Sequence, residues 1–194
     1  MSGWSCRRSG RSPGWPVIDA CLTARSPYVY IANEWSAVRD LLDRDEQARG
    51  REVALVTGAG FRPAATETLV LRLVGQPRTV PARMHVAAAA QVSRHGEGVR
   101  RTIEESISQG AITYRNGQSV REPLGSGATV LTFGAAHRRM LPGPVGDLEA
   151  AKRASGAPDV VASLRTWPGQ SAGAAPASGP RSSPGTGAVP WPNW

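Results

Sequence analysis

The chain has 194 residues, of which 23 are Lys or Arg and 15 are Asp or Glu, so its formal net charge at pH 7 is +8. This length suits one domain, or one and a half small ones. No stretch approaches the roughly 18 apolar residues of a membrane span, so we expect no membrane partner. No apolar stretch follows Arg7, Arg8 and Arg11, as a secretory signal would require, which favours a cytoplasmic location.

The excess of basic residues raises nucleic acid as a partner. Nearly all of this charge is Arg, with Lys152 as the only lysine, and it is mixed with acidic residues in 34–49 and 97–105. Aromatic residues do not alternate with basic ones, as they do on surfaces that bind single strands. Arg-rich nucleic-acid binding is therefore the least favoured hypothesis.

The two ends of the chain differ in composition from its middle. Residues 1–15 and 167–194 are rich in Ser, Gly, Pro and Ala or Arg and show no apolar periodicity, so we predict a disordered arm and a disordered tail. Cys6 and Cys21 are too few for a disulfide framework or a zinc site. We therefore expect no metal site and a reducing compartment.

The first half of the chain alternates helical and strand-like patterns. Pro16 is expected to open a helix, and 28–32 to form a strand. Asn33 would cap a helix over 34–49, and a strand over 52–57 would follow. A further helix is predicted from Pro63 to Val74, with a buried face of Leu69, Val70 and Leu73. This alternation predicts an α/β fold with a parallel sheet.

The turn Thr57-Gly58-Ala59-Gly60 follows an apolar strand and precedes a helix. Such turns present backbone N–H groups to ligands in α/β folds. As a dinucleotide fingerprint the pattern is incomplete, because Pro63 replaces the third glycine and no acidic residue follows about 20 positions later. A short-chain dehydrogenase is excluded, because position 148, four residues before Lys152, is Leu rather than Tyr.

The second half reads as a separate α+β unit over 76–166. Asn116-Gly117 between two strand-like runs, 111–114 and 118–121, is a strong hairpin signal. The remaining elements are predicted as strands over 83–90, 129–133 and 159–164 and helices over 96–109 and 147–154.

Two motifs carry a resemblance to a known family. They are Tyr28-Val-Tyr-Ile-Ala-Asn-Glu34 and Thr57-Gly-Ala-Gly-Phe61, and the run Gly146-Asp-Leu-Glu-Ala-Ala-Lys-Arg-Ala-Ser-Gly-Ala-Pro158 agrees with them. Residues 16–164 thereby resemble saccharopine dehydrogenase-like NAD(P)-binding oxidoreductases. The resemblance implies the C-terminal part of a Rossmann-like domain over 16–75, followed by an α+β domain over 76–166 that supplies the substrate face and a homodimer contact.

The resemblance also implies an NAD(P) cofactor and a small-molecule substrate. The turn at Gly58 would lie near the nicotinamide, and the implied cofactor-binding residues are Asn33, Glu34, Gly58, Gly60 and Phe61. The first strand, the phosphate-binding turn and the ribose-binding acid should precede residue 16, where none is found. Tyr30 and Arg62 stand where the family often has Asp. We therefore expect a truncated or frame-shifted member that is impaired in cofactor binding, and we assign no catalytic residue.

Simpler interpretations of these and other polar residues stay open. Glu34 suits a helix N-terminus by its charge alone, as do Asp147 and Glu149. Arg138 and Arg139 are expected in a solvated loop. The histidines share no ligand spacing; they are His85, His95 and His137. The alternative functions are a non-enzymatic dimerisation or interaction module and, last, the nucleic-acid binder.

Overall fold

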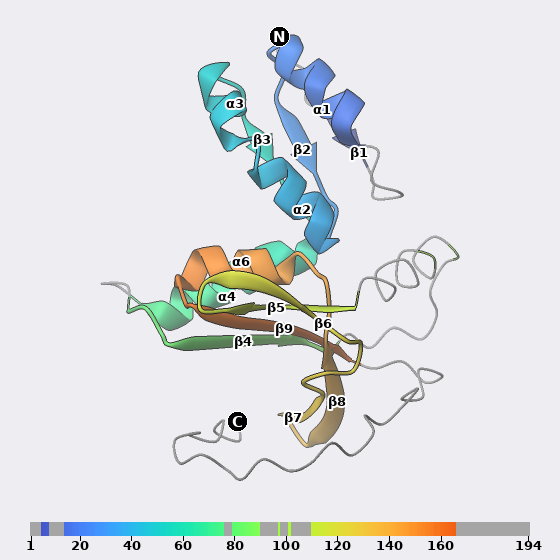
Figure 1. Ribbon diagram of the computed structural model, residues 1–194, viewed down its shortest axis with the longest axis vertical. Coiled ribbons are helices and arrows are strands. Elements are labelled where there is room, and N and C mark those ends of the chain that lie inside the picture. Colours follow the sequence, from blue (N-terminus) through green and yellow to red (C-terminus); the bar gives the residue numbers. More distant parts are fainter. Residues whose placement is uncertain are drawn as a thin grey trace.

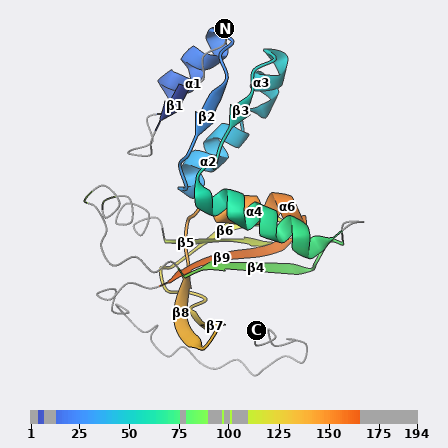
Figure 2. The same cartoon turned by 180° about the vertical axis from the view of Figure 1, so that it is seen from behind.

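The computed structural model describes residues 5–7, 14–75, 79–89, 97, 101 and 110–165. A small three-stranded sheet lies at one end of the molecule and a six-stranded sheet at the other, as Figure 1 shows. Helices α4 (Phe61–Val74) and α6 (Asp147–Ser155) lie between them, and Figure 2 shows α4 on the outer side of this layer. The fold is thus mixed α/β. None of the helices in the described ranges has the length and apolar character needed to cross a bilayer.

The small sheet is entirely parallel, as the alternation of helices and strands predicted. Its order is β1 (Ser5–Arg7), β2 (Tyr28–Tyr30) and β3 (Leu55–Val56), with Tyr28 paired to both Ser5 and Leu55. Strand β1 corrects the expectations that residues 1–15 are disordered throughout and that no strand precedes residue 16. The rest of that arm before residue 14, and the whole tail 167–194, lie outside the described residues.

Two helical boundaries differ from the predictions. Helix α1 (Gly14–Thr23) begins before Pro16. The single helix expected over 34–49 is two helices, α2 (Trp35–Leu42) and α3 (Asp45–Gly50). At the break, Arg44 is the N-cap residue of α3, and its side chain, which is only 12% exposed, forms an ion pair with Asp19 on α1.

The core of the small region is formed by helices α1 to α3 packed on β2. Tyr28 and Tyr30 stack with their ring centroids 5.9 Å apart. The buried apolar residues of this core are Ile18, Cys21, Leu22, Tyr28, Tyr30, Ala32, Ala37, Leu41, Ala48 and Val53. All of them precede the glycine turn, so this region packs around itself.

The large sheet has the order β6-β5-β9-β8-β7, with β4 paired in parallel to β9 and the other pairs antiparallel. The predicted hairpin is confirmed: Asn116 and Gly117 have φ of 49° and 81°, as a type I′ turn requires. The strands are β4 (Arg83–Ala88), β5 (Ala111–Arg115), β6 (Gln118–Glu122), β7 (Thr129–Phe133), β8 (Ala136–Pro142) and β9 (Asp159–Arg165).

Strand β8 was not predicted. Arg138 and Arg139 belong to it rather than to a loop, because β8 pairs with β7 on one side and β9 on the other. The predicted helix over 147–154 is confirmed as α6. The predicted helix over 96–109 lies outside the described residues except for Glu97 and Arg101, which are helical.

Helix α4 packs against α6 with only part of the face that was predicted. Val70 and Val74 are buried, whereas Leu69 and Leu73 are 69% and 73% exposed. The core that α4 joins contains Val70, Val74, Met84, Ile112, Tyr114, Val145, Leu148, Ala151, Ala154, Ala157, Val160 and Ala162. It therefore draws on residues on both sides of the domain boundary expected near residue 76.

Candidate functional site

The glycine turn lies against the end of the neighbouring strand, as parallel pairing requires. The N–H of Ala59 donates to the carbonyl of Tyr30 at 3.1 Å. A Cβ on Gly60 would lie 3.0 Å from the carbonyl oxygen of Ile31. Gly58 has a φ of +62°, and a Cβ there would meet the Pro63 ring at 3.1 Å. Both glycines are thus needed for the turn itself, whether or not a ligand binds.

Asn33 and Glu34 bind other parts of the chain. Glu34, not Asn33, is the N-cap residue of α2, and no side chain caps that helix. The Asn33 N–H donates to Glu34 Oε2 at 3.0 Å, and its carbonyl accepts from the N–H of Gly146 at 2.7 Å. These residues therefore join the end of β2 to the segment before α6. The ring of Phe61, the fifth predicted site residue, lies in solvent, with 88% of the residue exposed.

The first turn of α4 already faces a carboxylate of the chain. Asp147 is 3% exposed; its Oδ2 accepts from Arg62 Nη2 at 2.7 Å and its Oδ1 from the Thr66 hydroxyl at 2.8 Å. The Arg62 guanidinium, the cation of this first turn, is thus already paired with Asp147 and is not available to a phosphate at the helix N-terminus. The turn at Gly58 thus does not fit a pyrophosphate, as its expected place near the nicotinamide also implied.

The ends of β2 and β3 and the first turn of α4 together contain buried polar atoms that suit a neutral ligand. Within the described residues, the buried side-chain atoms without a hydrogen-bond partner include Asn33 Oδ1, Thr57 Oγ1 and Arg62 Nε. All three residues follow β2 or β3 or lie in the first turn of α4. Buried polar atoms of this kind are satisfied in proteins by ordered water or by a polar ligand.

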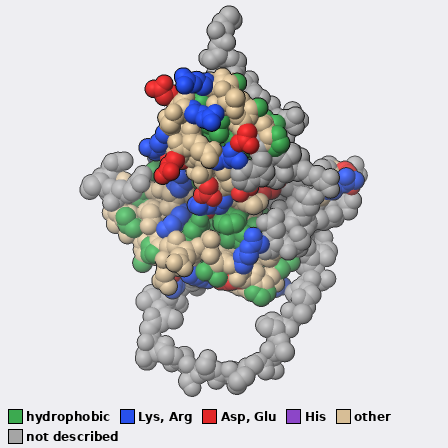
Figure 3. Space-filling model, turned by 45° about the horizontal axis from the view of Figure 1, so that its top comes forward, with side chains coloured by type: hydrophobic (Ala, Val, Ile, Leu, Met, Phe, Trp, Pro, Cys, Tyr) green, Lys and Arg blue, Asp and Glu red, His purple; other side chains and the backbone are tan. Residues whose placement is uncertain are grey.

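A cleft lies between α2 and the β5–β6 hairpin. It has a volume of about 640 Å³ and is open to solvent. Its lining comes from one face of α2 and from the facing hairpin, and comprises Trp35, Ser36, Arg39, Asp40, Asp43, Tyr114, Gly117, Gln118, Ser119 and Arg121. This cleft joins the two regions of the molecule, and the charged groups in its walls are of both signs. On the face seen in Figure 3, basic and acidic side chains are likewise intermingled.

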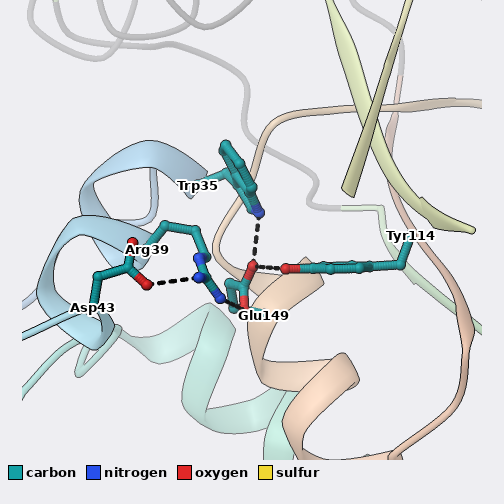
Figure 4. A network of polar contacts seen from close by, with 5 residues as sticks. All are labelled: Trp35, Arg39, Asp43, Tyr114 and Glu149. Atoms are coloured by element: carbon teal, nitrogen blue, oxygen red, sulfur yellow. Dashed lines mark hydrogen bonds and ion pairs between the residues drawn. The ribbon is translucent and has the colours of Figure 1, made fainter. Parts of the chain in front are cut away.

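Beneath the cleft lies Glu149, which is 2% exposed and is reached by three side chains from two elements, α2 and β5 (Figure 4). Trp35 Nε1 donates to its Oε1 at 2.8 Å, and the Tyr114 hydroxyl donates to the same oxygen. Arg39 Nη1 lies 3.7 Å from Oε2, while Arg39 Nη2 donates to Asp43 at 2.6 Å. The buried carboxylate is therefore both hydrogen-bonded and paired with a cation, as a buried charge must be.

This network fixes the protonation of the cleft wall. Burial raises the pKa of Tyr114, and the hydrogen bond to Glu149 and its charge raise it further, so the phenol remains a donor at neutral pH. Burial lowers the pKa of Arg39, but the carboxylates of Glu149 and Asp43 outweigh this and raise it overall. Burial and the nearby Asp43 raise the pKa of Asp40. Tyr114 and Arg39 can therefore position a polar ligand in fixed charge states.

The sequence analysis treated Glu149 and Asp147 as ordinary helix-start acids, whereas the structure buries both. The available signal was their position in a helix rich in alanine, because Ala150, Ala151 and Ala154 allow close packing on several sides. A charged residue in such a helix needs a partner.

The histidines lie apart from this network. His85 Nε2 is 2.9 Å from the hydroxyl of Ser163, and burial lowers the pKa of that imidazole. His137 Nδ1 lies 3.1 Å from the hydroxyl of Thr132, and His95 is outside the described residues. The described part of the chain contains no group of three side chains arranged to hold a metal ion.

Comparison with known proteins identifies no relative that shares this site. Neither a scan against protein-family models nor a search of curated proteins finds a match for the chain.

Proposed function

We propose that this chain is a saccharopine dehydrogenase-like NAD(P)-dependent oxidoreductase by descent that binds a small polar molecule in the cleft between α2 and the β5–β6 hairpin. The observation that carries the binding site is the cleft itself, with Trp35, Arg39 and Tyr114 held in its wall by the buried Glu149. Side chains fixed in this way orient a ligand at low entropic cost.

The reaction class rests on the resemblance, and two features of the small region support it. Three parallel strands in the order β1-β2-β3 agree with half of a doubly wound dinucleotide-binding sheet. The glycine turn after β3 lies at the carboxyl end of that sheet, next to Tyr30 and Ile31. Ligands of open α/β sheets bind at such ends.

Cofactor affinity is expected to be low. Arg62, the cation in the first turn of α4, is already paired with Asp147, so it adds nothing to the binding of a cofactor phosphate there. The nicotinamide moiety would lie nearest Asn33, Gly58 and Gly60. When bound, the cofactor would supply the hydride; the residues of this chain would orient the substrate in the cleft and keep Tyr114 protonated beside it.

The test is a calorimetric titration of the full chain with NADPH, repeated with the variant Gly60→Val. A Cβ at Gly60 would press on the Ile31 carbonyl and displace the turn. We expect saturable but weak binding, with a Kd of roughly 0.1–1 mM, and loss of that binding in the variant. The matched control is Gly50→Val, because a Cβ at Gly50 meets no atom within 4 Å.

Two results would contradict the proposal in different ways. A low-micromolar Kd would show that cofactor binding is not impaired. The absence of saturable binding at about 10 mM NADPH, or equal binding by the Gly60→Val variant, would remove the oxidoreductase assignment from this turn.

A further inference from the structure

Helix α4 carries an apolar stripe that the large core leaves exposed. Phe61, Leu69 and Leu73 are 88%, 69% and 73% exposed, and the half-buried Ala65 lies between them. Single exposed apolar residues are common on protein surfaces, but a contiguous apolar row on one helix is not. Figure 2 shows α4 in front of the helix layer, with α6 behind it.

The spacing of the stripe is regular. Phe61, Ala65, Leu69 and Leu73 are each four residues apart, which forms one ridge of a helix surface. Reversing the direction of the helix exchanges the four positions with one another: position 61 with 73 and position 65 with 69. In an antiparallel pair centred near residue 67, Leu69 of each copy would therefore lie opposite the small Ala65 of the other, and Phe61 opposite Leu73, as a two-fold interface requires.

The exposed area agrees with this occupant. Taking about 200 Å² for a fully exposed Phe or Leu, the three long side chains offer roughly 450 Å² per copy. With the flanking stems of Arg72 and Thr68, two copies would bury on the order of 1,000–1,200 Å². This is the lower limit for a specific interface and suits a reversible dimer.

We propose that the Phe61–Ala65–Leu69–Leu73 stripe of α4 is the contact between two copies of this chain, with the two helices antiparallel about a two-fold axis near residue 67. This interface does not depend on the proposed oxidoreductase function, because none of the four side chains lines the cleft. It fills the face of α4 that the large core leaves uncovered.

The charges beside the stripe determine how the contact responds to salt. In an antiparallel pair, Arg72 of one copy lies opposite Arg62 of the other. Arg62 is bound to Asp147, whereas Arg72 is exposed and can keep its guanidinium in water while its stem packs. The like charges oppose association weakly, so added salt is expected to tighten the dimer.

The experiment is sedimentation equilibrium of the full chain from about 1 to 500 μM. We expect a monomer–dimer equilibrium with a Kd of roughly 1–100 μM. The double variant Leu69→Gln with Leu73→Gln should weaken it by at least about 30-fold. The matched control is Leu71→Gln: Leu71 is also partly exposed, at 39%, but lies about 160° around the helix from Leu69. It should leave the Kd within about 2-fold of wild type.

A charge reversal tests the geometry and strengthens rather than weakens the contact. Arg72→Glu would place a carboxylate opposite the partner's Arg62, and should tighten the dimer by about 3- to 10-fold at low salt and remove its favourable response to salt. Circular dichroism verifies that each variant is folded. A monomeric wild type at 500 μM, equal dissociation by Leu71→Gln, or no tightening by Arg72→Glu would each overturn the proposal.

Discussion

The two sheets of this molecule are held together in different ways. The small sheet has strands of two or three residues, whereas the strands of the large sheet have five to seven. Strands as short as β3 form few ladder hydrogen bonds, so helices packed on Tyr28 and Tyr30 must supply most of the order of the small region. The large region has both a continuous ladder and a helix-covered core.

The small region is attached to the large one largely through residues 144–149. The N–H of Trp35 donates to the carbonyl of Pro144 at 3.0 Å, and the N–H of Gly146 to the carbonyl of Asn33 at 2.7 Å. Glu149 and Asp147 then bind side chains from α2 and α4. The comparison teaches that buried polar contacts of α6, together with the packing of Trp35 on the large core, join the regions and form the cleft. The following predictions are ordered from the largest effect to the smallest.

The largest loss is expected in the core of the large region. Leu148→Ala removes a side chain with no exposed surface and should lower the free energy of unfolding by about 3–4 kcal/mol, affecting the whole chain. Ile18→Ala, in the core of the small region, should affect only that region. Urea denaturation followed by circular dichroism would show one shifted transition for the first variant and an early partial transition for the second.

Glu149→Ala should cost about 3 kcal/mol, because it leaves Trp35 Nε1, the Tyr114 hydroxyl and Arg39 without their common acceptor. Tyr114→Phe removes one donor and leaves the carboxylate bound to Trp35, so it should cost only about 1 kcal/mol. Equal losses in thermal denaturation would show that the carboxylate does not act as the centre of the network.

Asp147→Asn should cost about 1–2 kcal/mol, because the amide retains one of the bonds to Arg62 and Thr66 but loses the charge that pairs with Arg62. Asp45→Asn is the control, since its ion pair with Arg49 is exposed, and should change stability by less than about 0.5 kcal/mol. If chemical denaturation gives the same value for both, Asp147 does not fasten α4 to α6.

The smallest effect is a gain. Burial and the neighbouring Asp43 raise the pKa of Asp40, so folding favours its protonated form and loses that contribution as the pH rises through the folded-state pKa. Asp40→Asn should therefore stabilise the chain at pH 7, by less than about 0.5 kcal/mol because the group is well solvated. The gain should vanish near pH 3, where wild-type Asp40 is protonated. A gain of the same size at both pH values would rule out this cause.

Local signals in the sequence predicted much of the fold. The hairpin at Asn116-Gly117 and helix α6 are both present, since turn chemistry and helix stop signals act within a few residues. On α4, Val70 is buried as predicted, but Leu69 and Leu73 are exposed, because these residues are similarly apolar and only packing against α6 decides which of them is buried. Strand β8 was missed because Arg138 and Arg139 mask its period while its neighbours in the sheet supply the pairing.

The candidate site was less predictable than the fold. Gly58 and Gly60 lie at the expected strand end, since the strand and turn are adjacent in sequence. In the Glu149 network, Trp35 lies 114 positions and Tyr114 lies 35 positions before Glu149 in the sequence. No local pattern indicates that these side chains meet there. Long-range packing alone creates the cleft.

The most direct test of the attachment through α6 is native-state hydrogen exchange on wild type and on Glu149→Ala. If buried polar contacts join two separately packed regions, the variant should lose amide protection mainly in residues 14–56, while β8 and β9 keep protection close to that of wild type. A matching loss in β8 and β9, or unchanged protection in 14–56, would contradict the account and show that the two regions unfold as a single unit.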